Sequence, residues 1–119
     1  MKLDPLDVLF SKFIRLRAMS RVGGCERCLH TKVDYKQLQC SHFHGRGKKS
    51  VRWDEDNSVG LCGGCHMYLT AHPIEHVRWF EERLGDRADL LEARMRATRL
   101  KPDKVALKLY YLEQIKGLE

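Results

Sequence analysis

The sequence predicts a small α+β domain, in which a short β-hairpin is flanked by an N-terminal helix and by two to three C-terminal helices. Strand-like segments occupy the middle of the chain, and helical periodicity occupies both ends. Two Cys-x-x-Cys pairs bracket the middle region. The 119 residues, 43% of them hydrophobic, are expected to form one domain: a helix over 1–21, a core over 22–72 and a helical part over 73–119.

The first predicted helix begins after Asp4, which can cap it, with Pro5 as its first residue. Its apolar residues fall on one face and are expected to pack: Leu6, Leu9, Phe10, Phe13 and Ile14. Residues 22–24 contain two glycines, which end the helix and allow the tight turn that leads to the first cysteine pair.

The middle of the chain is predicted to be a short irregular hairpin. Residues 33–43 have the composition of a strand. Residues 51–53 and 58–61 flank an acidic turn at 54–57, so they are expected to form the rest of the hairpin.

The C-terminal part is predicted to be helical. Residues 61–69 should turn through the second cysteine pair into a short helix that has His66 near its start. Pro73 opens the next helix and Gly85 ends it, with Ile74, Val77, Phe80 and Leu84 expected inward. Asp86 should cap a helix over 86–100, and Lys101-Pro102 should separate it from the last helix, over 103–116. Their expected apolar stripes are Leu91 and Met95, then Val105, Leu109 and Leu112.

The two cysteine pairs, Cys25-x-x-Cys28 and Cys62-x-x-Cys65, predict one four-cysteine zinc site. Four thiolates fill a tetrahedron and leave no position for substrate, so this Zn²⁺ would be structural. It would also supply the crosslink that a small core needs. The alternatives are two disulfides or two redox-active pairs. The fifth cysteine, Cys40, is expected to pack as a small hydrophobe in a strand.

The net charge of +6 favours a polyanionic partner, and the local distribution of charge sharpens this expectation. Residues 44–52 read HGRGKKSVR, which is basic, rich in glycine and free of acids. Such a loop could bind DNA phosphates without reading bases, through Arg46, Lys48, Lys49 and Arg52. The alternative is a merely solvated loop.

No apolar run is long enough to span a bilayer, and the N-terminal residues lack the long apolar segment of a signal peptide. We therefore expect no membrane partner. We also expect a cytoplasmic location with reduced thiols.

Four segments together resemble the HNH, or ββα-metal, endonuclease family: Cys25-x-x-Cys28, Ser41-His42-Phe43, residues 52–57 (RWDEDN) and Cys62-x-x-Cys65-His66. The likeness is closer to the phage recombination endonuclease family called NinG or Rap, and more distant to phage endonuclease VII, which has a similar four-cysteine zinc. It covers roughly residues 21–85. The resemblance implies a metal-dependent DNA endonuclease, in a bacterial or phage-infected cell, that leaves 5′-phosphate and 3′-hydroxyl ends.

In this interpretation the histidine, asparagine and histidine of the HNH motif correspond to His42, Asn57 and His66. A neutral imidazole such as His42 suits a general base near neutral pH, and His66 would bind a catalytic Mg²⁺ or Mn²⁺. Asn57 would tie the hairpin loop and keep His42 oriented. Singly, each has an ordinary alternative: a strand-surface histidine, a turn former and a helix residue beside zinc.

Two further ligands are weaker predictions. Ser41 stands where many relatives have an acidic or histidine ligand, so the catalytic ion would bind through fewer protein groups. We expect Mn²⁺ to outperform Mg²⁺, because imidazole suits it better. His44 would share a strand face with His42 if the strand continued, and would then be an extra contact to metal or phosphate.

The resemblance suggests branched DNA, including four-way recombination junctions, as substrate. Symmetric cutting of two strands would call for a homodimer, for which the C-terminal apolar stripe is a candidate interface. Three other functions stay open: a non-catalytic zinc-ribbon protein that binds nucleic acid, a catalytically decayed HNH protein, and a thiol oxidoreductase.

Overall fold

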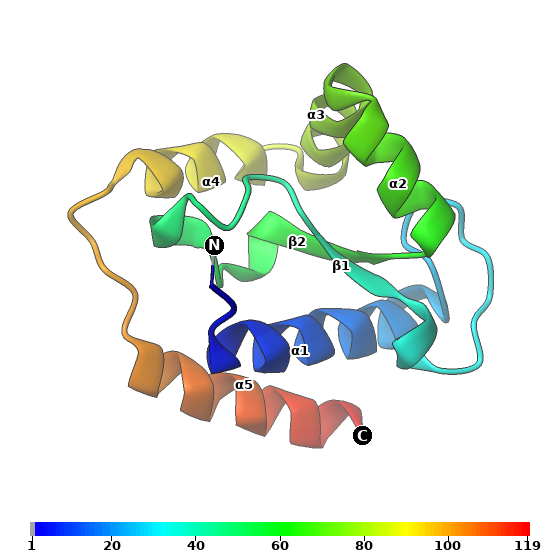
Figure 1. Cartoon of the computed structure of the whole chain (residues 1–119), viewed down its shortest axis with the longest axis horizontal. Helices are drawn as coiled ribbons and strands as arrows, with labels where there is room; N and C mark the ends of the chain where they lie inside the picture. Colours follow the sequence, from blue (N-terminus) through cyan, green and yellow to red (C-terminus); the bar gives the residue numbers. More distant parts are fainter. Residues whose placement is uncertain (1) are drawn as a thin grey trace.

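A computed structural model describes residues 2–119, and in this range the fold is α+β, as predicted, with five α-helices and one two-stranded sheet. Strands β1 (Gln39–His42) and β2 (Ser58–Leu61) pair antiparallel, with Cys40 opposite Gly60. Helix α1 (Pro5–Val22) packs across both strands, and α2 (Gly63–Ala71) continues directly from β2 (Figure 1).

Helix α1 forms as the sequence predicts. The Asp4 carboxylate accepts a hydrogen bond from the N–H of Leu6, and the Asp7 carboxylate accepts one from the N–H of Asp4, which completes a capping box. Gly23 ends the helix with a left-handed φ of 69°. The predicted apolar face packs on helix α5 (Lys104–Leu118), where Phe10 and Phe13 contact the ring of Tyr111.

Gly60 lets β2 approach α1 closely. A Cβ at this position would lie 2.7 Å from the Cβ of Ala18, well inside van der Waals contact. The close approach buries Ala18, Val59 and Leu61 in one cluster with Leu69 and Phe80, behind the cysteine pairs.

The predicted hairpin is corrected in its details. Only residues 39–42 of the segment 33–43 are strand, and 3₁₀ turns occupy Tyr35–Gln37 and Lys49–Val51. Residues 51–53 are therefore not a strand. The partner of β1 is β2 alone, and the two strands are joined by the long loop 43–57 rather than by a tight acidic turn.

The helices after α2 are α3 (Pro73–Leu84), α4 (Arg87–Arg96) and α5. In α3 Phe80 and Leu84 are buried as predicted, but Ile74 and Val77 are exposed, because α3 meets the core only along its C-terminal half. Leu91 of α4 is buried and Met95 packs beside it. Asp86 precedes α4 without making a side-chain cap, which corrects that prediction.

Helix α5 turns a different face inward from the one predicted. Val105, Leu109 and Leu112 are exposed, whereas Tyr111 and Ile115 are buried against α1. The tyrosine can be buried because its hydroxyl donates to the main-chain carbonyl of Trp53. Over residues 2–119, none of the helices is both long enough and apolar enough to cross a membrane.

Candidate functional site

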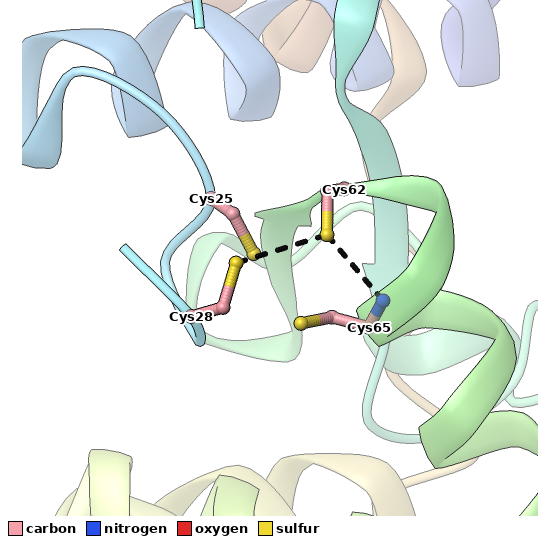
Figure 2. Close-up of side chains that lie close together, drawn as sticks. All are labelled: Cys25, Cys28, Cys62 and Cys65. Carbon is pink, nitrogen blue, oxygen red and sulfur yellow. Dashed lines mark hydrogen bonds between the residues drawn. The ribbon is translucent and has the colours of Figure 1, made fainter. Parts of the chain in front are cut away.

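The four cysteines of the two pairs come together, although they are far apart in sequence. Cys25 and Cys28 lie in the turn after α1, Cys62 caps the N-terminus of α2, and Cys65 lies in its first turn. Their four Sγ atoms all lie within 4.8 Å of one another, and Figure 2 shows the side chains converging on one point. Such a cluster could hold a metal ion, plausibly zinc.

The spacing of the sulfurs fits tetrahedral zinc. Zn–S bonds of about 2.3 Å place the sulfurs of a tetrahedron about 3.8 Å apart, and Sγ of Cys28 lies 3.8 Å from Sγ of Cys62. That distance is far beyond a disulfide bond of about 2.05 Å, and all five cysteines are free. Cys25 and Cys65 are buried, which also disfavours exposed redox-active thiols.

Several donors around the cluster favour thiolates. The N–H of Cys65 donates to Sγ of Cys62, and Arg27 donates to Sγ of Cys65, each at 3.4 Å. Burial raises the pKa of Cys25, but main-chain N–H groups outweigh it and lower that pKa to about 7. Burial raises the pKa of Cys65 to about 12; the hydrogen bond from Arg27 opposes this increase, and the neighbouring thiols add to it. Since four thiolates repel one another, full ionisation requires a cation among them.

Cys40 lies apart from this cluster. It is half-buried in β1, and burial raises the pKa of its thiol to about 11. Its predicted place in a strand is confirmed, but it is half-buried rather than fully buried.

A second feature is an open cavity of about 450 Å³ that holds three of the predicted site residues: His42, His66 and Arg46. They come from the end of β1, the first turn of α2 and the basic loop. The other lining residues are Leu3, Asp7, Ser11, Cys40 and Gly45.

His42 is held as a neutral imidazole. Its ring lies 6.1 Å from that of Phe10, between centroids, and its Nε2 is buried without a hydrogen-bond partner among the described residues. Burial lowers the pKa of His42 to about 4, the charge of Arg46 adds to this effect, and Asp7 opposes it. Because the ring is unprotonated at pH 7, it can accept a proton.

His66 is oriented by Gln39, whose Oε1 lies 2.6 Å from its Nδ1. An amide oxygen only accepts, so this contact places a proton on Nδ1 and leaves Nε2 with a free lone pair. Burial also lowers the pKa of His66, which favours the neutral form that can bind a metal. No sequence signal pointed to Gln39, because the contact joins a strand to a helix.

Asn57 is fully buried and clamps the chain directly after His42. Its Oδ1 accepts from the N–H of His44 at 2.9 Å, and its Nδ2 donates to the carbonyl of His44 at 2.8 Å. Its main-chain carbonyl also accepts from the N–H of Phe43. The predicted tie across the loop therefore exists, while its effect on His42 stays a prediction.

Arg52 is a correction within the predicted DNA-binding set. Its guanidinium is buried and donates twice to the carboxylate of Asp7, so it is not available to a phosphate. Asp7 is a site residue that the sequence did not suggest. Lys48 and Lys49 are exposed, and Arg46 lies in the cavity with its Nη1 3.9 Å from Asp7.

The two weaker metal ligands lie outside the cavity. Ser41 is buried on the face of β1 opposite His42, and β1 ends at His42, so His44 does not continue that face. The His44 ring instead stacks on Phe43, with 4.4 Å between centroids. Among residues 2–119, the four cysteines are the only group of three or more potential ligands close enough to hold a metal.

No family model, curated protein or solved structure matches this chain. What the chain does has to be inferred from its own residues and their geometry.

Proposed function

We propose that this chain is a zinc-stabilised, metal-dependent DNA endonuclease of the HNH type. The observation that supports this most is the single cavity shared by His42, His66 and Arg46, beside a loop that Asn57 clamps. The order β1, β2, α2 around four cysteines is also the order expected for a ββα-metal core. The four cysteines would hold the structural Zn²⁺.

In the proposed reaction, neutral His42 accepts a proton from the attacking water. The water oxygen forms a bond to phosphorus while the bond from phosphorus to the 3′ oxygen breaks. The 3′ oxygen then takes a proton from solvent, which leaves a 5′-phosphate and a 3′-hydroxyl. Arg46 would orient a phosphate in the cavity by charge-assisted hydrogen bonds.

His66 is the proposed protein ligand of a catalytic Mg²⁺ or Mn²⁺, through Nε2. When bound, the ion would neutralise charge on the phosphorus oxygens and on the leaving oxygen. Because no group of three or more potential ligands includes His66 among the described residues, water and phosphate would complete the coordination. The catalytic ion would therefore bind weakly to the free protein and more tightly when DNA is bound.

The test is cleavage of supercoiled plasmid and of a synthetic four-way junction by the wild type and by His42→Ala, with Mg²⁺, Mn²⁺ or EDTA. Loss of a general base should lower the rate by about 10² to 10⁴. The matched control is His72→Ala, since His72 is exposed and lies outside the cavity. Equal cutting by His42→Ala and the wild type would refute the proposed base.

The second candidate is a non-catalytic zinc protein that binds nucleic acid, or a decayed relative of the nucleases. Two observations favour it: Lys48 and Lys49 are exposed, and no group of three or more potential metal ligands among residues 2–119 includes His66. In that case neither His42→Ala nor the wild type would cut, while both would bind DNA equally well.

A preference for branched DNA and a homodimer are proposals from the resemblance. The exposed Val105, Leu109 and Leu112 are available for a second copy of the chain. Sedimentation velocity at the assay concentration should show a dimer that Leu109→Glu dissociates. Leu90→Glu on α4, which is similarly exposed, is the control. A wild type that sediments only as a monomer contradicts the dimer.

A further inference from the structure

A second groove is lined by the residues that directly follow Gly45 and Arg46 in the same loop. Gly45 and Arg46 line the cavity of His42, and the next four residues, 47–50, line a separate cavity of about 530 Å³. The opposite wall of this second groove is the end of α4 and the turn after it. Its lining residues are Gly47, Lys48, Lys49, Ser50, Met95, Arg96 and Thr98.

The two walls of the groove are fixed to one another. The Ser50 hydroxyl donates to the main-chain carbonyl of Met95 at 2.9 Å. Below them, Val51 and Leu91 are fully buried in one cluster. In Figure 1, α4 lies against the 3₁₀ turn that follows the basic residues. The groove is therefore a built part of the fold rather than a gap between mobile loops.

The groove is cationic and its charges are accessible. Lys48, Lys49 and Arg96 line it, and no carboxylate is among its described lining residues. Lys48 and Lys49 make no ion pair with any residue in the range 2–119. Arg96 pairs only with Glu92 on the same helix, at 2.9 Å and with its side chain 74% exposed. Such surface pairs are weak and can exchange for a phosphate.

The neighbouring arginines of α4 have a different role. Arg87 and Arg94 point to Asp56 and Asp54, and Arg94 makes two hydrogen bonds to the Asp54 carboxylate. These two arginines neutralise the acidic part of the loop 43–57. The positive charges of α4 and the loop that are not paired with these aspartates therefore include Lys48, Lys49 and Arg96, which line the groove.

We propose that this groove binds the phosphodiester backbone of duplex DNA beyond the bond that is cut. The proposal rests on the proposed function, because the partner is taken to be the strand that crosses the His42 cavity. One strand can follow the continuous loop 45–49 from that cavity into the groove. Lysine and arginine contacts to phosphate add affinity and register without reading sequence.

The test is the binding of a fluorescent duplex in EDTA, so that no cleavage occurs, over a series of salt concentrations. The groove variant is Lys48→Gln/Lys49→Gln/Arg96→Gln. The control, Lys36→Gln/Arg78→Gln/Lys116→Gln, removes the same charge from exposed residues on other elements. Each lost phosphate contact should reduce the slope of log K against log salt by about one. We expect a reduction of about three in the groove variant and a nearly unchanged slope in the control.

Equal slopes and equal affinities in the two variants would overturn the groove. The proposal would also be overturned if the groove variant bound duplex DNA normally and lost only its binding to single-stranded RNA or to an acidic peptide. If Arg96→Gln impairs folding, Lys48→Gln/Lys49→Gln gives the same test with a slope change of about two. A wild type that binds through the groove but never cuts refutes the nuclease alone, whereas a groove variant that binds and cuts like its control refutes the groove alone.

Discussion

The side-chain amide of Asn57 hydrogen-bonds both main-chain polar groups of His44, the N–H through Oδ1 and the carbonyl through Nδ2. Asn57 precedes β2 and His44 follows β1, so one buried side chain closes the open end of the sheet. His42 is the last residue of β1, two positions before the clamp. The clamp therefore fixes the direction in which the chain leaves the candidate general base.

Asn57→Ala should lower the free energy of unfolding by about 2 to 4 kcal/mol, because two partly buried main-chain groups of His44 lose their hydrogen-bond partners. Urea denaturation of the zinc-loaded protein measures this. Asn57→Asp retains an acceptor for the N–H of His44 but places a buried carboxylate against the His44 carbonyl, so near pH 7 it should lose at least as much stability as the alanine variant. A smaller loss in Asn57→Asp would contradict donation by Nδ2 to that carbonyl.

Asp7→Asn should remove an acid-sensitive part of the stability. Burial opposes ionisation of Asp7, but hydrogen bonds from Arg52, from the N–H of Asp4 and from Trp53 lower its pKa from 3.8 to about 2. A lowered carboxyl pKa adds stability that is present above about pH 4 and is lost as the pH falls towards 2. The shift corresponds to about 2 kcal/mol at pH 7.

Denaturation of the wild type and Asp7→Asn between pH 7 and pH 2 tests this directly. The difference in stability should be largest at neutral pH and should shrink below about pH 4. Asp86→Asn, at an exposed position that caps nothing, should follow the wild type throughout. A pH-independent difference for Asp7→Asn would indicate a loss of packing rather than of the carboxylate charge.

Zinc removal should unfold the hydrophobic cluster that packs against the cysteines, which includes Ala18, Val59, Leu61, Leu69 and Phe80. Cys25→Ser should lower the zinc content below one ion per chain and should lower the thermal midpoint of unfolding. In small zinc domains the free energy of metal binding contributes directly to the free energy of folding. Metal analysis and calorimetry with and without chelator provide the measurement. Cys40→Ser is the control and should keep one zinc, because Cys40 lies outside the cluster. A Cys25→Ser protein that keeps one zinc ion per chain and an unchanged thermal midpoint would refute the four-cysteine zinc site.

His66 should determine the preference for the catalytic metal. With an imidazole ligand, Mn²⁺ should support cleavage at lower concentration than Mg²⁺, and His66→Asp should shift the preference towards Mg²⁺, because carboxylate oxygens suit it better. Titration of each metal against the initial rate of cleavage measures both effects. Equal activity of the wild type in low concentrations of the two metals would count against imidazole ligation.

The sequence was most informative where one local rule decided the structure. Asp4, Pro5 and Gly23 determine the ends of α1, and the pairs beginning at Cys25 and Cys62 predicted their own convergence. The helix ends are determined by residues within a few positions of one another. The cysteine pairs are predictable because few arrangements other than a shared metal satisfy four thiolates at this spacing.

The errors came from contacts between distant segments. Arg52 looked like a member of the basic loop, but Asp7, from the first turn of α1, neutralises it. Helix α5 has apolar residues on more than one face, and the position of α1 decides that Tyr111 rather than Leu109 is buried. Periodicity cannot choose between two faces of similar hydropathy when the partner helix is unknown.

The arrangement of the cysteines along the chain has a kinetic consequence. The segment 29–61, which contains β1, the long loop and β2, lies between the two pairs. Metal bound to both pairs in the unfolded chain closes this segment into a ring before the strands meet, so part of the entropy of loop closure is lost before the folding barrier. Zinc should therefore accelerate refolding, in addition to slowing unfolding, and the cell's supply of zinc would set how quickly a new copy of this chain becomes native.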